Sequence, residues 1–319
     1  MNAPSADAPA AAPLAARRWP AELAWMWGVS LVCYALSWTL SRNVVEQLPP
    51  AWAASGRLLA TACMLGVLAW LQPRHRIGMA QLRGSWQSFA LLALLGFGGY
   101  FGLTFSALQF LHATDLSVVL ALTPAMTYLL AVLGGSERVR WRCSAGVALA
   151  TFSALAFHGL GAGRAAGMHG VGVALAMAAV AAYAGYAVLY GRKLGAWPVV
   201  GTVAVLTLLA SAQLAVFALL IEGPPPVLSG GAMLKLAILG ALLSAPVYVL
   251  FSRMVQSGHT LLATLVAVAG PFGVLALEWM LGTRAGSPSD LLLMSAAGIG
   301  VWLVVWGRAT PFPPRKEAA

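Results

Sequence analysis

The chain has 319 residues, of which 60% are hydrophobic and only 9% charged, and its mean hydropathy is +0.83. A soluble domain carries about 25% charged and about 45–50% apolar residues, so soluble enzymes, secreted domains and nucleic-acid-binding modules are excluded. The net charge of +10 lies in short basic clusters between apolar runs, which is typical of a membrane protein. The three cysteines lack metal-ligand spacing, so we expect no metal, cofactor or disulfide framework.

Ten apolar stretches are long enough to cross a bilayer, which takes about 20 residues. Before them, residues 1–20 form an Ala/Pro-rich tail that we expect to be disordered and cytoplasmic. This tail is not a signal peptide, because Arg17 and Arg18 precede a full-length span. A cytoplasmic tail, residues 309–319, follows the last span. The spans run near residues 22–41, 51–71, 87–110, 115–133, 143–160, 170–190, 198–221, 232–252, 260–281 and 290–307.

The basic residues predict the orientation of these spans. If the N-terminus is cytoplasmic, 14 of the 19 lysines and arginines lie at cytoplasmic ends and four at outer ends, with Arg57 inside a span. Cytoplasmic connections of membrane proteins carry the excess of positive charge. We therefore expect both termini to be cytoplasmic.

The fourth and ninth spans align without a gap at an offset of 147 residues. The alignment pairs Pro124 with Pro271 in mid-span and Gly135 with Gly282 at the end of each span. Splitting ten spans into two sets of five turns the second set upside down. The sequence thus predicts an all-α integral membrane protein with ten transmembrane helices as two inverted five-helix repeats, residues 21–160 and 170–308. Inverted repeats are typical of secondary transporters, which bind substrate near the midplane between the halves.

Three passages form a recognisable pattern: the span from Trp27 to Arg42 followed by Pro50 and Arg57, the small-residue run 113–124, and Gly135-Ser-Glu-Arg138 followed by Gly146. These passages resemble EamA-type proteins of the drug/metabolite transporter superfamily. The resemblance covers about residues 21–308 and implies a bacterial inner-membrane exporter of amino acids, amines, nucleobases or drugs. The second half departs from the pattern, because Arg284 stands at the position that matches Glu137.

Three ionisable side chains are candidate functional groups, because charge within a bilayer is costly. Arg57 lies roughly 9 Å into the second span at 1.5 Å per residue, either as an anion clamp for a substrate carboxylate or as a snorkelling or structurally paired arginine. Asp115 is either a partner of Arg57 or an N-cap shared with Thr114. Glu278 is expected to be solvated at the outer interface, and ion or proton coupling is the alternative role for Asp115 and Glu278. We expect solvated interfacial positions, not proton relays, for His112, His158 and His259.

Aromatic side chains predict the walls of a cavity. All seven tyrosines fall inside spans, where an unpaired hydroxyl in lipid is costly, so most should face protein or a wet cavity. Helical spacing places Tyr34 with Trp38, and Tyr183 with Tyr186, on shared faces. Such a cavity suits a flat or amphipathic substrate or a cation, and ordinary helix packing is the alternative for each residue. With Arg57, the candidate cavity residues are Tyr34, Trp38, Tyr100, Phe101, Tyr128, Tyr183, Tyr186 and Tyr248.

Two prolines and two glycines are candidate kink or gating positions. Pro124 and Pro271 each remove a helix hydrogen bond and kink the chain, and a purely structural kink is the alternative. Gly98 and Gly102 allow close approach of helix backbones and give the third span freedom to flex. Internal packing is favoured over a dimer face for these glycines and for the pairs Gly146/Ala150 and Ala296/Gly300.

The favoured interpretation is a secondary-active transporter, not an enzyme, that works by alternating access and exports amino-acid-like or aromatic solutes. No nucleotide-binding motif is present, so we expect no ATP, and the expected partners are a small-molecule substrate and the lipid bilayer, with a monomer favoured. A passive channel or facilitator is the alternative. An intramembrane enzyme is less favoured, because no nucleophile is paired with a histidine or carboxylate at depth.

Overall fold

The computed structural model describes residues 21–135, 137–160, 166–194, 197–256, 260–283 and 287–309, and these residues form an all-α structure. Each of the ten expected spans corresponds to one helix or to a stack of consecutive helical segments. The expected tail 1–20 and residues 310–319 of the expected tail 309–319 lie outside the described residues, as do Arg164, His259 and Arg284. In chain order the first half comprises α1 (Ala21–Val45), α2 (Pro50–Leu71), the 3₁₀ turn η2 (Pro73–His75), α3 (Met79–Gly84), α4 (Trp86–Ala93), η3 (Leu94–Gly99), α5 (Tyr100–Ala107), α6 (Ala113–Leu120), α7 (Thr123–Leu133) and α8 (Trp141–Leu160).

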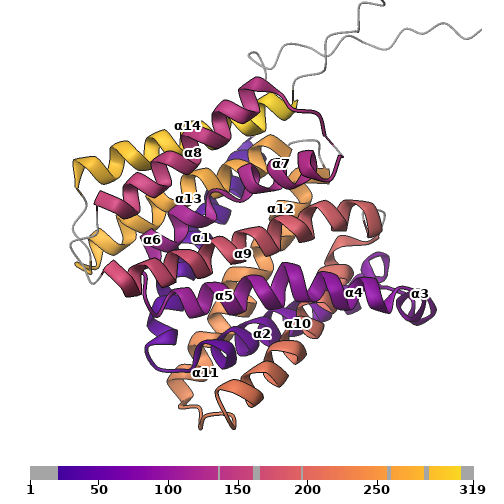
Figure 1. The fold of residues 1–319 in the computed structure, drawn as a ribbon. Coiled ribbons are helices and arrows are strands. Elements are labelled where there is room, and N and C mark those ends of the chain that lie inside the picture. The colour runs from indigo at the N-terminus through magenta and orange to yellow at the C-terminus, as the bar shows by residue number, and fades with distance from the viewer. Residues whose placement is uncertain are drawn as a thin grey trace, which may run out of the picture.

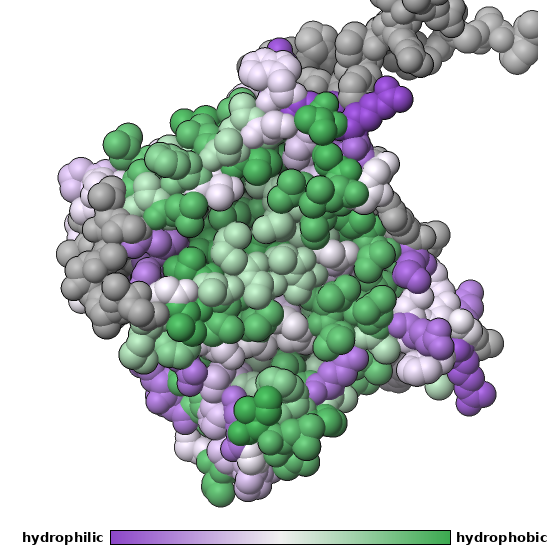
Figure 2. Space-filling model, viewed as in Figure 1, coloured by the Kyte–Doolittle hydropathy of each residue, from purple (hydrophilic) through white to green (hydrophobic). Residues whose placement is uncertain are grey.

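The second half continues the same pattern. It comprises α9 (Ala166–Lys193), α10 (Val199–Ile221), α11 (Gly230–Ala237), η4 (Ile238–Ser244), α12 (Ala245–Gln256), α13 (Thr260–Met280) and α14 (Pro288–Ala309). Within the described residues, eight helical stretches are long and apolar enough to cross a membrane, and Val266–Met280 forms a shorter apolar helix. Figure 2 shows apolar side chains over the middle of the molecule and hydrophilic ones toward its ends. The chain is therefore a multi-pass membrane protein.

The helices pack in pairs that combine the two halves of the chain. Helix α8 lies beside α14 along one edge, and α2 packs against α10 toward the opposite edge (Figure 1). Between these pairs, α1 packs against α13 and η4, while α9 packs against α5 and α7. Helices distant in sequence therefore form the interior, and a side chain of one half meets side chains of the other.

The third and eighth spans each contain a π-helical turn, η3 and η4. A π-turn leaves backbone carbonyls without their usual i+4 donors. In η4 a side chain supplies such a bond, because Ser244 Oγ donates to the Leu239 carbonyl at 2.6 Å. One turn before η3, Gln213 Nε2 donates to the Ala90 carbonyl at 3.0 Å. Neither π-turn was expected from the sequence.

The two paired prolines act differently. Span four is interrupted at residues 121–122, and Pro124 lies in the first turn of α7, where its missing N–H disturbs no helix bond. Pro271, in contrast, lies inside the continuous helix α13. The aligned prolines thus produce a break in one span and an internal proline in the other.

The paired glycines share one conformation. Gly135 has φ 68° and Gly282 has φ 67°, values that favour glycine because it lacks a Cβ. The Gly135 N–H donates to the Val132 carbonyl and the Gly282 N–H to the Trp279 carbonyl, again 147 residues apart. The equal caps support the predicted alignment of the fourth and ninth spans.

Small residues bring α8 and α14 into backbone contact. A Cβ placed on Gly146 would lie 2.6 Å from the Gly300 carbonyl oxygen, and one on Gly300 would lie 2.5 Å from the Ala150 nitrogen. On the third span, Gly98 and Gly102 face α10 side chains, Gln213 and Leu214 respectively. These glycines pack internally.

A methyl group at Gly300 tests this contact. We expect Gly300→Ala to destabilise the folded protein by about 1–3 kcal/mol, because the added carbon has no room between α8 and α14. Gly66→Ala is the matched control in α2, since a Cβ there meets nothing within 4 Å, and it should be neutral or stabilising. Thermal unfolding in detergent measures both, and equal midpoints for the two variants would contradict the packing argument.

Candidate functional site

The only ionisable candidate within the middle of the bundle, among the described residues, is Arg57 of α2. It is the eighth residue of that helix, and its side chain is 4% exposed. The guanidinium therefore does not extend to the membrane surface, so the snorkelling interpretation is wrong. A charge removed from water in this way needs partners within the protein.

Three serine hydroxyls bind the guanidinium. Arg57 Nη2 donates to Ser37 Oγ at 2.7 Å, Nη1 donates to Ser41 Oγ at 3.0 Å, and Nε donates to Ser244 Oγ at 3.1 Å. Ser37 and Ser41 lie one turn apart on α1, and Ser244 is the last residue of η4. Arg57 thus joins two helices of the first half to the π-turn of the second half.

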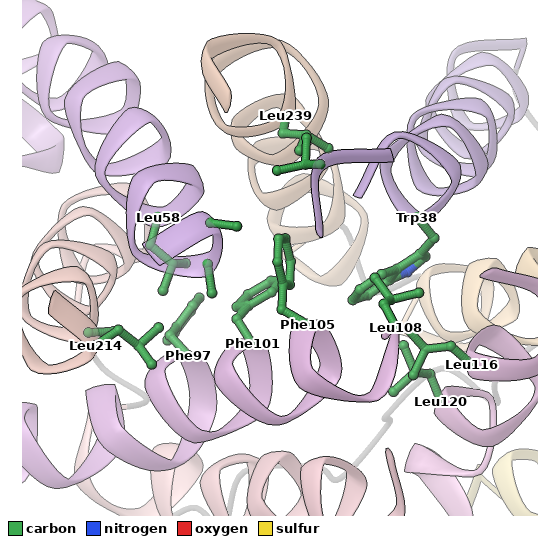
Figure 3. Packing of buried hydrophobic residues seen from close by; sticks show 14 of the residues in the cluster. Trp38, Leu58, Phe97, Phe101, Phe105, Leu108, Leu116, Leu120, Leu214 and Leu239 are labelled. Atoms are coloured by element: carbon green, nitrogen blue, oxygen red, sulfur yellow. The ribbon is translucent and has the colours of Figure 1, made fainter. Parts of the chain in front are cut away.

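Aromatic rings cover the rest of the guanidinium. Its central carbon lies 4.6 Å from the ring centroid of Phe101, 5.3 Å from that of Trp38 and 5.7 Å from that of Phe105. Phe97, Phe101 and Phe105 recur every four residues and point from one face of the third span toward Leu58 and Leu239 (Figure 3). Each cation–π contact is worth about 0.5–2 kcal/mol.

Four half-buried tyrosines surround this centre. Tyr34, Tyr100 and Tyr248 lie within electrostatic range of Arg57. The Tyr183 ring is 4.9 Å from that of Tyr100 and connects it to α9. We call these four tyrosines, together with Ser37, Trp38, Ser41, Arg57, Phe101, Phe105, Tyr186 and Ser244, the arginine–aromatic cluster.

Backbone contacts position both π-turns against this cluster. A Cβ on Gly240 of η4 would overlap the Arg57 carbonyl oxygen, and Thr61 Oγ1 donates to the Gly240 carbonyl at 3.2 Å. A Cβ on Gly96 of η3 would overlap the ring of Tyr186. Glycine is therefore required where each π-turn approaches the cluster.

Tyr128 lies apart from the arginine–aromatic cluster. Its hydroxyl accepts a hydrogen bond from the Arg140 backbone N–H at 2.8 Å, and its ring packs with Cys143 and Val304. The sequence analysis grouped it with the cavity residues because it falls inside a span. The structure places it at the junction of α7, α8 and α14.

The two acidic candidates lie together at the N-terminus of α6 and not beside Arg57. Asp115 is the third residue of α6, and its carboxylate accepts from the N–H of the N-cap residue His112 at 3.4 Å. No carboxylate of the described residues is within salt-bridge distance of Arg57, so the expected Arg57–Asp115 pair is not formed. His112, not Asp115, is the N-cap.

Glu278 is buried, at 3% exposure, so its expected solvation is wrong. Its carboxylate accepts from the Ala113 N–H at 3.0 Å and from the Thr114 hydroxyl at 2.6 Å. A carboxylate at a helix N-terminus satisfies otherwise unpaired N–H groups and matches the helix dipole. Glu278 thereby fastens α13 of the second half to α6 of the first.

His158 is also buried, contrary to the expected interfacial solvation. Its Nδ1 lies 3.2 Å from Nε2 of His169. The pair brings together the end of α8 and the beginning of α9. His169 covers His158, so this histidine is shielded from solvent by packing between the two halves.

Sequence reasoning missed the serines and Phe105. Ser37 and Ser41 occupy the same helical face as Tyr34 and Trp38, at spacings of three and four residues, so that signal was present. Ser244 gave no such signal, because its position beside Arg57 depends on how η4 packs against α2.

Residues 24–157 match the EamA-like transporter family. This segment contains Arg57 and most of the arginine–aromatic cluster. Residues 24–157 belong to that family. EamA proteins are membrane transporters of the drug/metabolite type, so the match implies a membrane transporter of that type.

A solved crystal structure shares the fold of nearly the whole chain. It matches with a TM-score of 0.64 at 19% sequence identity and covers 91% of this chain and 99% of its own. At that identity the likeness establishes the fold alone. No curated protein matches the chain.

Neutralising Glu278 tests its role at α6. We expect Glu278→Gln to destabilise the protein by about 1–3 kcal/mol, because hydrogen bonds to a charged group are lost from a buried site. Glu46→Gln is the control, since Glu46 is 56% exposed and pairs only with Arg42 one turn away on the surface. Thermal unfolding in detergent should show a lowered midpoint for Glu278→Gln alone. An unchanged midpoint for Glu278→Gln would show that its charge does not stabilise the contact with α6.

Proposed function

We propose that this EamA transporter is a secondary-active exporter of small organic metabolites that carry a carboxylate, with amino-acid-like and aromatic solutes favoured. In this proposal it lies in the cell (inner) membrane with both termini cytoplasmic. The observation that carries the proposal is Arg57, a buried cation whose contacts are serine hydroxyls and aromatic rings. A substrate carboxylate supplies the counter-charge.

The chemistry of the guanidinium favours a carboxylate ligand. Arginine presents five N–H donors in a planar fork that matches two carboxylate oxygens, and charge-assisted pairs of this kind are stronger than bonds to a hydroxyl. Hydroxyls of serine can also rotate to donate to an incoming carboxylate. Ser37, Ser41 and Ser244 position the guanidinium, and their hydroxyls also hydrogen-bond the bound carboxylate.

The tyrosines favour a flat or amphipathic substrate. Tyr34, Tyr100, Tyr183 and Tyr248 present half-buried rings and hydroxyls around Arg57. Ring faces attract aromatic groups and ammonium ions, and the hydroxyls accept or donate hydrogen bonds. An aromatic amino acid satisfies both its carboxylate and its ring at such a site.

The placement of the cluster between the two halves supports alternating access. α1, α2 and α5 come from the first half, while η4, α9 and α12 come from the second. Paired glycine caps and a π-turn in each half support the proposed division into repeats 21–160 and 170–308. Relative rocking of two such halves exposes a central site first to one side and then to the other.

In the same proposal Glu278 couples transport to protons. Protonation removes the charge with which Glu278 holds the α6 N-terminus, and so weakens a contact between the two halves. Asp115, at the same helix terminus, is the second candidate. The expected consequence is that Glu278→Gln transports without response to an imposed pH gradient.

Reconstitution into liposomes tests this function. Uptake of labelled neutral and aromatic amino acids, amines and nucleobases is measured with and without a pH gradient. Gradient-driven accumulation of a saturable solute is the expected result. Unsaturable flux without a gradient effect would identify a passive facilitator and contradict the proposal.

Arg57→Ala should raise the half-saturation concentration for a carboxylate solute at least about tenfold, because a charge-assisted pair worth about 1.5–3 kcal/mol is lost. The matched ligands are phenylalanine and its decarboxylated amine, phenethylamine, and uptake of the amine should not fall. Arg57→Lys retains the charge without the planar fork, so its half-saturation concentration for phenylalanine should lie between those of the wild type and Arg57→Ala. Equal losses for both ligands, from protein that elutes as a single folded species, would exclude the clamp.

Tyr100→Leu and Tyr183→Leu should change the ranking of aromatic over aliphatic substrates by about threefold to tenfold, since a stacked ring contributes about 0.5–1.5 kcal/mol. Tyr128→Phe is the control, because Tyr128 lies outside the arginine–aromatic cluster. Competition assays in proteoliposomes measure the ranking. An unchanged ranking in both leucine variants would assign these rings to helix packing alone.

A further inference from the structure

A second group of arginines lies at the junction of α7 and α8, far in sequence from the cluster around Arg57. Arg138, Arg140 and Arg142 occur within five residues, with Trp141 between the last two. Arg142 contacts Trp306 near the end of α14, and Trp306 stacks on Trp302. We call the set of Arg138, Arg140, Trp141, Arg142, Trp302 and Trp306 the arginine–tryptophan patch.

Stacking orients Arg142. Its guanidinium carbon lies 5.0 Å from the Trp306 ring centroid and 5.7 Å from that of Trp141. The Trp302 and Trp306 rings are themselves stacked, 5.4 Å apart with 8° between their planes. Stacking engages the face of a guanidinium, whereas its N–H donors lie in the plane. Arg142 is therefore held in position while its donors stay available to an anion.

The neighbouring arginines add charge and rigidity. Arg140 Nη1 donates to the Gly307 carbonyl at 2.6 Å and so binds the end of α14 to the beginning of α8. Arg138 is exposed, as is Arg142. Figure 2 shows hydrophilic side chains gathered at this end of the molecule, where α7 meets α8 in Figure 1.

The patch continues into an apolar surface along α8 and α14. Phe152 and Leu155 of α8 and Ile299 of α14 are exposed large apolar side chains on this pair of helices. Trp141 is 75% exposed, and indole rings in membrane proteins gather at the level of the lipid headgroups. Basic groups therefore lie at headgroup level, above side chains that suit acyl chains.

We propose that the arginine–tryptophan patch binds an anionic phospholipid, with the headgroup phosphate between the guanidinium groups of Arg138 and Arg142. Arginine recognises phosphate oxygens in a bidentate manner, and basic sites between transmembrane helices bind anionic headgroups. The acyl chains lie along the exposed side chains of α8 and α14. This proposal is independent of the transported solute.

The test measures binding of phosphatidylglycerol to the full-length protein in detergent by native mass spectrometry. Phosphatidylcholine and inorganic phosphate are the comparison ligands. We expect Arg138→Gln combined with Arg142→Gln to weaken phosphatidylglycerol binding about 25-fold, because each guanidinium contributes about fivefold. Phosphatidylcholine binding should not change, and inorganic phosphate should not displace the lipid.

Arg74→Gln combined with Arg76→Gln is the matched control. Those arginines form another basic cluster, after α2, and their side chains bond to Gln72 and to the Trp70 carbonyl. The control should change phosphatidylglycerol binding by less than about twofold. A conservative pair, Arg138→Lys with Arg142→Lys, retains the charge but loses the planar forks. Its affinity for phosphatidylglycerol should lie between those of the wild type and the Arg138/Arg142 glutamine variant.

Three results would overturn the proposal. Equal weakening of phosphatidylglycerol binding by the Arg138/Arg142 and Arg74/Arg76 glutamine variants would show that net charge alone causes the effect. Displacement of the lipid by inorganic phosphate would identify a soluble anion as the ligand. A change of oligomeric state in the Arg138/Arg142 variant, with lipid binding intact, would assign this surface to contact between two copies of the chain.

Discussion

The side chain of Arg57 is 4% exposed, so the hydrogen-bond partners of its guanidinium must come from the protein itself. Serines from α1 and η4 and rings from α1 and α5 meet this requirement together. The packing of α1, α2, α5 and η4 therefore depends on one charge. Among the described residues, no carboxylate pairs with this charge. A buried guanidinium of this kind can pair with an anionic ligand.

Backbone irregularities lie where helices of the two halves meet around that charge. An α-helix satisfies its own backbone within lipid, so a π-turn persists only where side chains bind the carbonyls it releases. Ser244 does so in η4 and also accepts from Arg57, so the π-turn and the buried cation depend on each other. Ser244 therefore links Arg57 directly to the backbone of the eighth span.

Away from Arg57, carboxylates at helix N-termini also join the two halves. Glu278 of α13 binds the start of α6, and Glu222, just after α10, accepts from the Ala51 and Trp52 N–H groups at the start of α2. Each contact is short-range and charge-dependent. Contacts of this kind join a helix of one half to a helix of the other through charge-assisted hydrogen bonds.

The sequence by itself determined the class, the ten spans and the positions of Arg57, Trp38 and Phe101, because apolar length, helical spacing and the rarity of charge in a span are local properties. It also paired Gly135 with Gly282, which the structure shows to share one helix-capping conformation. Only the tertiary structure decided that Ser244 would meet Arg57, that Glu278 would be buried against α6, and that Tyr128 would lie elsewhere. Those outcomes depend on which helices of the two halves pack together, and a helix's own residues do not specify which partner covers each face.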